Sequence, residues 1–307
     1  MSVRVRKPGR VKAGRRAAAA LAALCVVAAS LWPRPHASRA QDGGCAPPLL
    51  EVGGPPAAGK APAAPAELKV VSYNIRYRAG EELERLAALL RDDPEIGGAH
   101  VIGLQEVDRD KKRTGNVNTA RRLAEALGMR YAWAAPPDAD GDGEEETGVA
   151  ILSPFPVSDV SRVLLTHEGP DGRRRVAVGA TLDVGGRALR VYSVHAETRM
   201  PLEKKVEHWR AVLEDLRLRP GVAGAIVLGD FNTIKPKDVR AARRLFAGEG
   251  FSAPHPDGDT TWQTFVFKLK LDWLWLRGLE ARAHGIDKKV GLSDHWPLWA
   301  TVRLAGK

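Results

Sequence analysis

Short apolar runs of the kind found in strands alternate with amphipathic helical patterns from residue 68 to residue 128. The runs LKVVSYNI (68–75) and HVIGLQEV (100–107) have strand length, whereas EELERLAALLRD (81–92) and NTARRLAEALG (118–128) repeat apolar residues at helical spacing. A pattern that switches its period in this way predicts an α/β fold, because each apolar face must be buried against another element.

The second half of the chain adds pairs of neighbouring strands. RRVAVGATLDV (174–184) and ALRVYSVHA (188–196) flank the turn signal Gly185-Gly186, and the helical pattern PLEKKVEHWRAVLEDLR (201–217) follows them. Adjacent hairpins favour antiparallel or mixed sheets. Two packed sheets with helices outside would bury the apolar faces of all these segments.

The first 40 residues have the composition of an export signal. Nine of the 47 basic residues lie here with no acidic residue, and a sixteen-residue apolar run from Ala17 to Trp32 is followed by small residues at positions 37, 38 and 40. Because that run is short for a membrane span, the pattern predicts a signal peptide over residues 1–40 and a periplasmic or extracellular protein. An uncleaved membrane anchor is the alternative.

Beyond this leader the charge is nearly balanced. The formal net charge of +10 falls to +1 without residues 1–40, because 38 basic residues then face 37 acidic ones. A nearly neutral body weakens the case for tight binding to duplex DNA, which depends on lysine and arginine along the backbone. Residues 41–66 are rich in Pro, Ala and Gly and are expected to form an extended linker, whereas residues 67–307 are expected to form the folded domain.

Polar side chains recur where the predicted strands end. Each one alone is more often a cap or turn residue than a functional group, but strand ends can meet at one rim of a sandwich, so their joint occurrence is informative. In IVLGDFNT (226–233), period-two alternation predicts that Asp230 and Asn232 face one spot while Phe231 faces the core. The whole set comprises Asn74, Glu106, His195, Asp230, Asn232, Asp272, Asp294 and His295.

The chain resembles the endonuclease/exonuclease/phosphatase superfamily over residues 68–303, through the ordered segments SYNIR, GLQEVD, VHAET, GDFN, LDWLW and SDHWP. That superfamily includes DNase I-like nucleases, exonuclease III-like repair enzymes, sphingomyelinases and inositol polyphosphate phosphatases. The resemblance implies a four-layer α/β sandwich, with two mixed or antiparallel sheets packed face to face and helices outside. It also implies hydrolysis of phosphate esters with a divalent cation, usually Mg²⁺, with Mn²⁺ as a substitute.

A phosphate anion must be neutralised before water can attack it, and a hard cation held by oxygen ligands does this. Glu106 is the best candidate ligand, and the resemblance adds Asn74 and Asp294. Asp230 is expected to orient or deprotonate the attacking water, and Asn232 to hold that water or a nonbridging phosphate oxygen.

Two histidines complete the predicted catalytic set. The resemblance pairs Asp272 with His295 and leaves His195 as a second donor to the phosphate or the leaving group. A neighbouring carboxylate raises the pKa of a histidine and fixes the orientation of its ring, so the pairing agrees with the chemistry.

Two arginines are candidate substrate contacts. Arg113 follows the strand that carries Glu106, and Arg174 lies in the middle of the cluster Arg173–Arg175. A guanidinium group binds phosphate well. The alternative for the cluster is an exposed strand that its charges protect from pairing with another chain.

These residues predict a phosphodiesterase or nuclease that uses a metal-assisted attack by water. A phosphatase, or a phosphodiesterase acting on phospholipids or small molecules, is the first alternative, and a catalytically inactive binding protein on the same fold is the second. The acidic segment Asp138–Glu146 would repel a long polyanion if it borders the site.

The only partner that the sequence indicates is a phosphodiester substrate, either nucleic acid or a small phosphoester. No protein partner is evident, and a monomer is expected. The sequence shows no long apolar hairpin that would insert into a bilayer, so stable membrane insertion of the mature domain is not expected.

Export predicts that the mature protein begins near Gln41, because signal peptidases cut after small residues such as Ala40. N-terminal mass spectrometry of the protein from its native host should detect a chain that starts near this residue, outside the cytoplasm. Recovery of only the intact Met1–Ala40 segment would contradict cleavage at this position.

Overall fold

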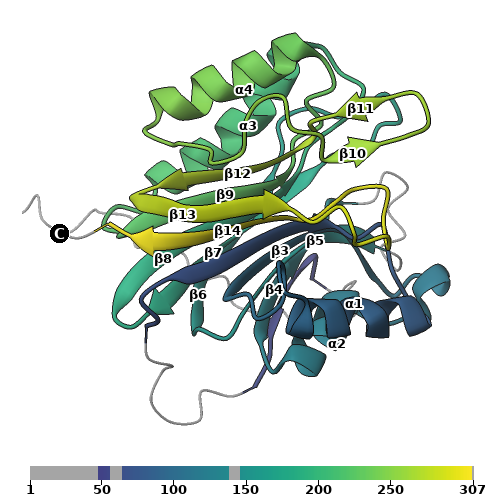
Figure 1. Cartoon of the computed structure of the whole chain (residues 1–307). Helices are drawn as coiled ribbons and strands as arrows, with labels where there is room; N and C mark the ends of the chain where they lie inside the picture. The colour runs from purple at the N-terminus through teal and green to yellow at the C-terminus, as the bar shows by residue number, and fades with distance from the viewer. Residues whose placement is uncertain (1–47, 56–63, 138–145, 306–307) are drawn as a thin grey trace, which may run out of the picture. The chain divides into compact units, whose positions relative to one another are not determined.

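The computed structural model describes residues 48–55, 64–137 and 146–305. The predicted signal peptide and all of the acidic segment except Glu146 lie outside these ranges, and they stay predictions. The described residues form two large mixed sheets and four α-helices. Figure 1 shows how these elements are arranged. The predicted α/β class is therefore confirmed.

The larger sheet has seven strands. In spatial order they are β1 (Leu50–Gly53), β4 (Arg130–Ala134), β5 (Glu146–Ser153), β3 (Val101–Arg109), β2 (Leu68–Asn74), β14 (Leu298–Leu304) and β13 (Leu279–Ile286). β2 and β3 are parallel, with Asn74 opposite Gln105, and the other neighbours are antiparallel. The ends of β2 and β3 therefore bring Asn74 beside the residue that precedes Glu106.

The smaller sheet has five strands. In spatial order they are β12 (Asp272–Arg277), β9 (Gly224–Asp230), β8 (Arg187–His195), β7 (Val176–Val184) and β6 (Val157–Leu164). β8 and β9 are parallel and pair His195 with Asp230, whereas β12 is antiparallel to β9 and pairs Asp272 with the same Asp230. One end of this sheet thus carries three of the predicted catalytic residues side by side.

The helices cover the outer faces of the two sheets. α1 (Gly80–Asp92) and α2 (Thr119–Leu127) pack on the seven-stranded sheet, and α3 (Leu202–Arg217) and α4 (Pro236–Gly248) pack on the five-stranded sheet (Figure 1). A third apolar cluster fills the space between the sheets. The order helix, sheet, sheet, helix is the expected four-layer sandwich. None of the described helices is long and apolar enough to cross a membrane.

Two short elements complete the fold. A one-turn 3₁₀ helix, Lys112–Thr114, follows β3, and β10 (Trp262–Gln263) pairs with β11 (Lys268–Leu269) in a small hairpin. This hairpin lies outside both large sheets and leads directly into β12.

Local sequence chemistry explains where α2 begins and ends. The side chain of Asn118 accepts a hydrogen bond from the backbone N–H of Arg121, which satisfies one of the free donors of the first turn. At the other end Gly128 adopts the left-handed conformation (φ 64°) that commonly closes a helix. The helix therefore presents its buried residues Leu123 and Ala124 to the sheet in a fixed register.

The structure differs from the expected linker at residues 50–53. These residues lie within the segment 41–66 that was expected to be an extended linker, but they form β1 and pair with β4 from Leu50–Ala134 to Gly53–Tyr131. Arg109 and Arg121 both bind Glu51, at 3.2 and 2.5 Å. Pairing and ion pairs between residues distant in sequence hold this strand, so composition alone could not reveal it.

The two sheets approach closely at Gly103. A Cβ atom added at this glycine would lie 1.9 Å from Cδ1 of Leu228 on the facing sheet. Both strands are buried in the described structure, so the side chain of Leu228 cannot turn toward solvent to make room for a larger residue at position 103. The absence of a side chain at Gly103 therefore sets the spacing of the sheets near the ends of β3 and β9.

We expect Gly103→Ala to destabilise the protein by about 1–3 kcal/mol, the usual cost of overpacking a filled core. Gly248→Ala is the matched control, because an added Cβ there meets no atom within 4 Å. Urea unfolding followed by circular dichroism should show a lower midpoint for Gly103→Ala alone. Equal midpoints for the two variants would contradict the proposed close contact.

Candidate active site

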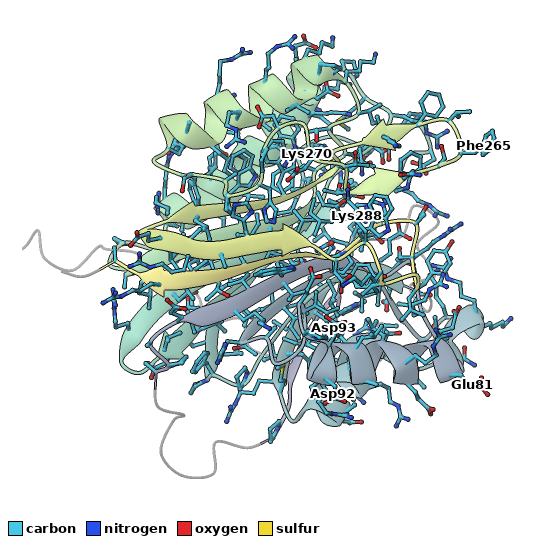
Figure 2. All side chains as sticks on the ribbon, viewed as in Figure 1. Glu81, Asp92, Asp93, Phe265, Lys270 and Lys288 are labelled. Carbon is cyan, nitrogen blue, oxygen red and sulfur yellow. The ribbon has the colours of Figure 1, made fainter. Side chains whose placement is uncertain are left out.

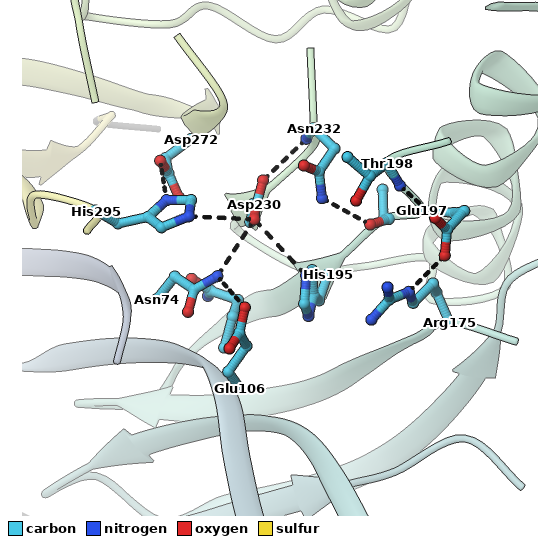
Figure 3. Close-up of polar contacts among 12 residues, drawn as sticks. Asn74, Glu106, Arg175, His195, Glu197, Thr198, Asp230, Asn232, Asp272 and His295 are labelled. Atoms are coloured by element: carbon cyan, nitrogen blue, oxygen red, sulfur yellow. Dashed lines mark hydrogen bonds and ion pairs between the residues drawn. The ribbon is translucent and has the colours of Figure 1, made fainter. Parts of the chain in front are cut away.

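The carboxylate of Asp230 lies at the centre of the predicted site. It accepts hydrogen bonds from the side-chain amide of Asn74 (3.3 Å) and from the backbone N–H of Asn232 (2.9 Å). Nε2 of His195 and Nε2 of His295 lie 3.6 and 3.8 Å from its Oδ2. Figure 3 shows these side chains converging on Asp230, so the structure brings together residues from four separate segments.

Asp272 and His295 form the predicted pair. Nδ1 of His295 lies 2.8 Å from Oδ2 of Asp272, and both side chains are buried. Asp272 is held in turn by its backbone N–H, which donates to Oγ1 of Thr261 at 3.0 Å. The ring nitrogen that faces Asp272 is thereby fixed, and the opposite nitrogen is left facing Asp230.

Electrostatics gives the two histidines opposite protonation states. Burial opposes the charged form of His295, but the carboxylate of Asp272, its hydrogen bond and Asp230 outweigh this effect and raise the pKa to about 10. Burial, followed by the positive charges of Arg175 and His295, lowers the pKa of His195 well below its usual value. Near neutral pH His295 is therefore a cation and His195 is neutral.

Asp230 is a stronger base than an ordinary aspartate. Burial disfavours its charged form, and the nearby carboxylate of Asp272 adds repulsion, so its pKa is raised even though His295 acts in the opposite direction. A carboxyl group with a raised pKa next to a charged imidazole is a typical arrangement for proton transfer.

Glu106 stands at an irregular point of β3. The pairing of β3 with β5 shifts register there, and Glu106 has a left-handed backbone (φ 55°). Its Oε1 accepts a hydrogen bond from Nδ2 of Asn74 at 3.1 Å. Arg76, Tyr77 and Asn232 are also left-handed (φ 48°, 47° and 51°). Strained backbone at non-glycine residues around one site is typical of functional sites, where bulges re-aim side chains.

Asn232 holds the loop after β9 rather than continuing the strand. Its N–H donates to Asp230, as described above, and its Nδ2 donates to the carbonyl of Ala196 at 2.9 Å. The preceding Phe231 is buried in the core as predicted, but the left-handed backbone of Asn232 ends the strand geometry on which that prediction rested. The carbonyl of Asn232 accepts a hydrogen bond from the buried Nζ of Lys205 at 2.6 Å, a support that the sequence gave no reason to expect.

Of the three predicted metal ligands, Asn74 and Glu106 contact each other, whereas Asp294 contacts other residues. Asn74 and Glu106 are hydrogen-bonded to each other, whereas Oδ2 of Asp294 accepts from Nε1 of Trp262 at 3.1 Å and lies 3.6 Å from Arg76. Glu106 and Asp294 both line the same cleft. Among the described residues the tightest group of potential ligands is Asp230, Asp272 and His295, whose ligand atoms lie within 4.8 Å of one another.

The cleft has a volume of about 480 Å³, and both predicted arginines line it. Arg113 donates two hydrogen bonds to Asp108, at 2.7 and 2.9 Å, and stacks 3.6 Å above the ring of Tyr77. Arg174 is about as exposed as Arg113 and makes one ion pair, with Glu168 at 3.3 Å. Both arginines can reach a bound anion, but Arg113 is held more firmly by its neighbours.

Arg175 is a site residue that the sequence analysis did not select from its cluster. It lines the cleft, and its Nε donates to the buried carboxylate of Glu197 at 2.9 Å. Glu197 also accepts from the backbone N–H groups of Thr198 and Arg199, at 2.8 and 3.0 Å. Figure 3 shows Glu197 between Arg175 and Thr198. The segment VHAET contained the signal, because an acid two residues after His195 can hold a neighbouring arginine.

Glu146 is the one residue of the acidic segment Asp138–Glu146 that the structure describes, and its carboxylate is not free to repel a substrate. Glu146 begins β5 and is buried, and both of its oxygens accept hydrogen bonds from Arg109, at 2.7 and 2.8 Å. Its charge is therefore neutralised by the protein. Residues 138–145 lie outside the described ranges, and their predicted effect on long polyanions stays a prediction.

Comparison with known proteins agrees with this geometry. A sequence model described as the endonuclease/exonuclease/phosphatase family matches residues 71–295. The chain is similar to an endonuclease/exonuclease/phosphatase from Beutenbergia cavernae DSM 12333, with 21% identity and a TM-score of 0.64 over 79% of this chain and 72% of that one. No curated protein matches the chain.

Two further solved structures share the fold. The human Nocturnin catalytic domain with bound sulfate anion has 21% identity and a TM-score of 0.59, over 78% of this chain and 94% of that one. ANGEL2, described as a 2',3'-cyclic phosphatase in complex with adenosine-2',3'-vanadate, has 16% identity and a TM-score of 0.57, over 80% and 99%. At these identities the likeness establishes the fold alone.

The pair formed by Asp272 and His295 can be tested by substitution. Asp272→Asn removes the charge that keeps His295 protonated, and His295→Ala removes the imidazole, so each should lower the hydrolysis rate by about 10² or more. Because the two residues act as a unit, the double variant should be little slower than the slower single variant.

Asp92→Asn, an exposed substitution at the end of α1, is the control for this experiment. Thermal unfolding of every variant should be measured alongside activity, because Asp272 is buried. Near-normal turnover by folded Asp272→Asn, or rate losses that simply multiply in the double variant, would show that the residues do not work as a pair.

Proposed function

The chain belongs to the endonuclease/exonuclease/phosphatase family, whose members hydrolyse phosphate esters, and from this premise we propose that it is an exported, metal-dependent phosphodiesterase or nuclease. The observation that carries the proposal is the meeting of a protonated His295, a neutral His195 and a basic Asp230 at one end of one cleft. Such a set can give and take protons at a single phosphate.

The residues present fit a hard divalent cation. Glu106 and Asp294 offer carboxylate oxygens to the cleft, which Mg²⁺ and Mn²⁺ prefer. Asn74 turns its amide nitrogen to Glu106, and its Oδ1 accepts from the backbone N–H of Arg76 at 3.1 Å. Glu106 adds negative charge next to Asp230, and Oδ1 of Asp272 is buried with no hydrogen-bond partner among the described residues. A cation bound here would meet negative charge that the described hydrogen bonds do not fully satisfy. Glu106 would hold the metal, with Asn74 and Asp294 contributing directly or through water.

When bound, the cation would neutralise charge on the phosphate and so favour attack by water. The side chains of this protein supply the remaining chemistry. Asp230 accepts a proton from the water whose oxygen bonds to phosphorus, and its raised pKa makes that transfer easier. As the bond from phosphorus to the leaving oxygen breaks, that oxygen takes a proton from His295, the histidine that carries one to give.

His295 and His195 differ in what they offer the phosphate. His295 carries a positive charge, which Asp272 stabilises, so it can neutralise a nonbridging oxygen or give up a proton. His195 is neutral and can donate one hydrogen bond without adding charge. Asn232, whose side chain and backbone are both held, would position the water or a nonbridging oxygen.

Arginines at the cleft favour a substrate that carries at least one phosphate charge. Arg113, Arg174 and Arg175 line it together with the histidines. Arg175 is the best placed of the three to bind an anion near His195. Its Nε donates to Glu197, which holds the guanidinium group in position.

The first alternative is a phosphatase, or a phosphodiesterase for phospholipids or small molecules. A nearly neutral domain favours this alternative over tight binding to duplex DNA, because duplex binding depends on many phosphate contacts. The second alternative, an inactive binding protein on the same fold, is disfavoured by the strained backbone at Glu106 and Asn232. A protein released from catalysis has no need to keep that strain.

We expect the purified protein to hydrolyse phosphodiesters only with Mg²⁺ or Mn²⁺. The substrates should include an aryl phosphodiester, an aryl phosphomonoester, single- and double-stranded DNA, sphingomyelin and inositol phosphates. Activity should disappear in excess chelator and return with added metal. Hydrolysis that continues unchanged in chelator would refute metal dependence, and no turnover of any substrate would favour the binding protein.

Glu106→Gln tests the proposed ligand. It should raise the Mg²⁺ concentration needed for half-maximal activity by about tenfold or more, because a charged oxygen ligand is lost. Glu280→Gln, an exposed change on β13, is the matched control. An unchanged Mg²⁺ requirement in folded Glu106→Gln would remove Glu106 from the metal site.

A further inference from the structure

The turn of the β10–β11 hairpin exposes three consecutive apolar side chains. Phe265 is fully exposed, and Val266 and Phe267 are exposed to 71% and 60%. Among the described residues only two other large apolar side chains, Val52 and Leu218, are comparably exposed, and they are isolated from each other in sequence. Figure 2 shows Phe265 at the outer end of the hairpin, pointing away from the rest of the protein.

Single exposed apolar residues need no explanation, whereas a cluster of them at one point indicates a binding surface. The turn that carries them is well ordered by hydrogen bonds. Thr264 N–H donates to the carbonyl of Phe267 at 2.9 Å, and Phe267 N–H donates to Oγ1 of Thr264 at 3.1 Å. The tip, defined as Phe265–Phe267, is therefore a formed projection.

The base of the hairpin belongs to the wall of the cleft. Trp262 and Leu269 pair with each other across the hairpin, and both line the cleft. Nε1 of Trp262 donates to Asp294, and Oγ1 of Thr261 accepts from the N–H of Asp272. A surface that binds the tip would therefore lie beside the opening of the cleft.

Basic residues predominate next to the hairpin. A depression beside it is lined by Lys235, Arg240, Lys268, Lys270, Asp257 and Asp259. Of the two acids, Asp257 is already bound by Arg243, whose Nε lies 2.9 Å from its carboxylate. Lys270 is buried and its Nζ donates to the carbonyl of Pro256 at 2.7 Å, so the exposed cations are Lys235, Arg240 and Lys268. These three cations lie beside the base of the hairpin and would attract anionic groups.

We propose that the tip docks on an anionic lipid surface, with its apolar side chains entering the headgroup region and the cleft held beside that surface. A projecting turn needs a partner that deforms around it, as a lipid surface does. Stable protein interfaces bury about 800 Å² on each partner, far more than three side chains at a turn can supply. Peripheral membrane proteins usually combine a few apolar side chains, which enter the headgroup region, with basic residues, which are attracted to anionic lipids.

This contact is reversible and does not conflict with the expected lack of stable membrane insertion, because three residues are far too few to span a bilayer. It goes beyond the proposed function and does not depend on it. Binding to lipid can be measured without turnover, so a failure of either idea is recognised separately.

The first measurement is co-sedimentation of the full chain with vesicles of equal parts phosphatidylglycerol and phosphatidylcholine, or of phosphatidylcholine alone. The double variant Phe265→Ser/Phe267→Ser should lower partitioning onto the anionic vesicles by about tenfold. Leu218→Ser, a change at another exposed apolar residue at the end of α3, should leave this partitioning within about twofold. Turnover of a soluble aryl phosphodiester should be the same in all three proteins, because the tip does not line the cleft.

The second measurement is local, because the leader of the full chain can itself bind vesicles. Hydrogen exchange should slow in peptides covering residues 262–271 when anionic vesicles are added, and less so with phosphatidylcholine alone. Sedimentation without protection of these peptides, or no sedimentation, would overturn the proposal. Equal protection by both kinds of vesicle would overturn the assignment to anionic lipid. Self-association that requires Phe265 and Phe267, in the absence of vesicle binding, would assign the tip to a second copy of the chain instead.

Discussion

The site depends on one buried carboxylate, that of Asp230. A charged group in the protein interior is tolerated only when hydrogen bonds and opposite charges surround it. Asp230 receives the amide of Asn74 from the seven-stranded sheet, a backbone N–H from its own loop, and the approach of two histidines from the five-stranded sheet and a later loop. The carboxylate of Asp230 therefore connects the two sheets in addition to its proposed role as a base. Because Asn74 and Asp230 lie on different sheets, the distance between them depends on the close approach of the sheets at Gly103.

Most of the fold, and the residues that lie around Asp230, could be predicted from the sequence. The reason is that the end of a strand can be recognised from a short stretch of sequence. Asn74, His195 and Asp230 each end an apolar run, and two parallel pairings bring such ends together at one rim. Period-two alternation also predicted the buried position of Phe231. The side chains that face one spot could thus be named without any knowledge of long-range contacts.

Other features depend on contacts that no local pattern encodes. β1 is held by ion pairs with residues more than 50 positions away, and Arg175 is distinguished from Arg174 only by the position of Glu197. Lys205, a buried residue in the first turn of α3, donates to the carbonyl of Asn232 and to Oδ2 of Asp238 at 3.3 Å. These supports hold a left-handed residue in place, and they show how surrounding structure stabilises a conformation that the local sequence disfavours.

The strand β1 also determines where the folded domain can be cut. The composition of the sequence predicts that the folded domain begins at residue 67. A recombinant fragment cut there would lack β1, the strand that pairs with the outer side of β4. β4 would then present a row of unpaired backbone groups, which is a common route to aggregation through sheet extension. It would also deprive Arg109 and Arg121 of Glu51, leaving a mostly buried guanidinium group with one carboxylate fewer. A soluble, monodisperse sample of the domain is therefore to be sought from fragments that retain the residues before Leu50.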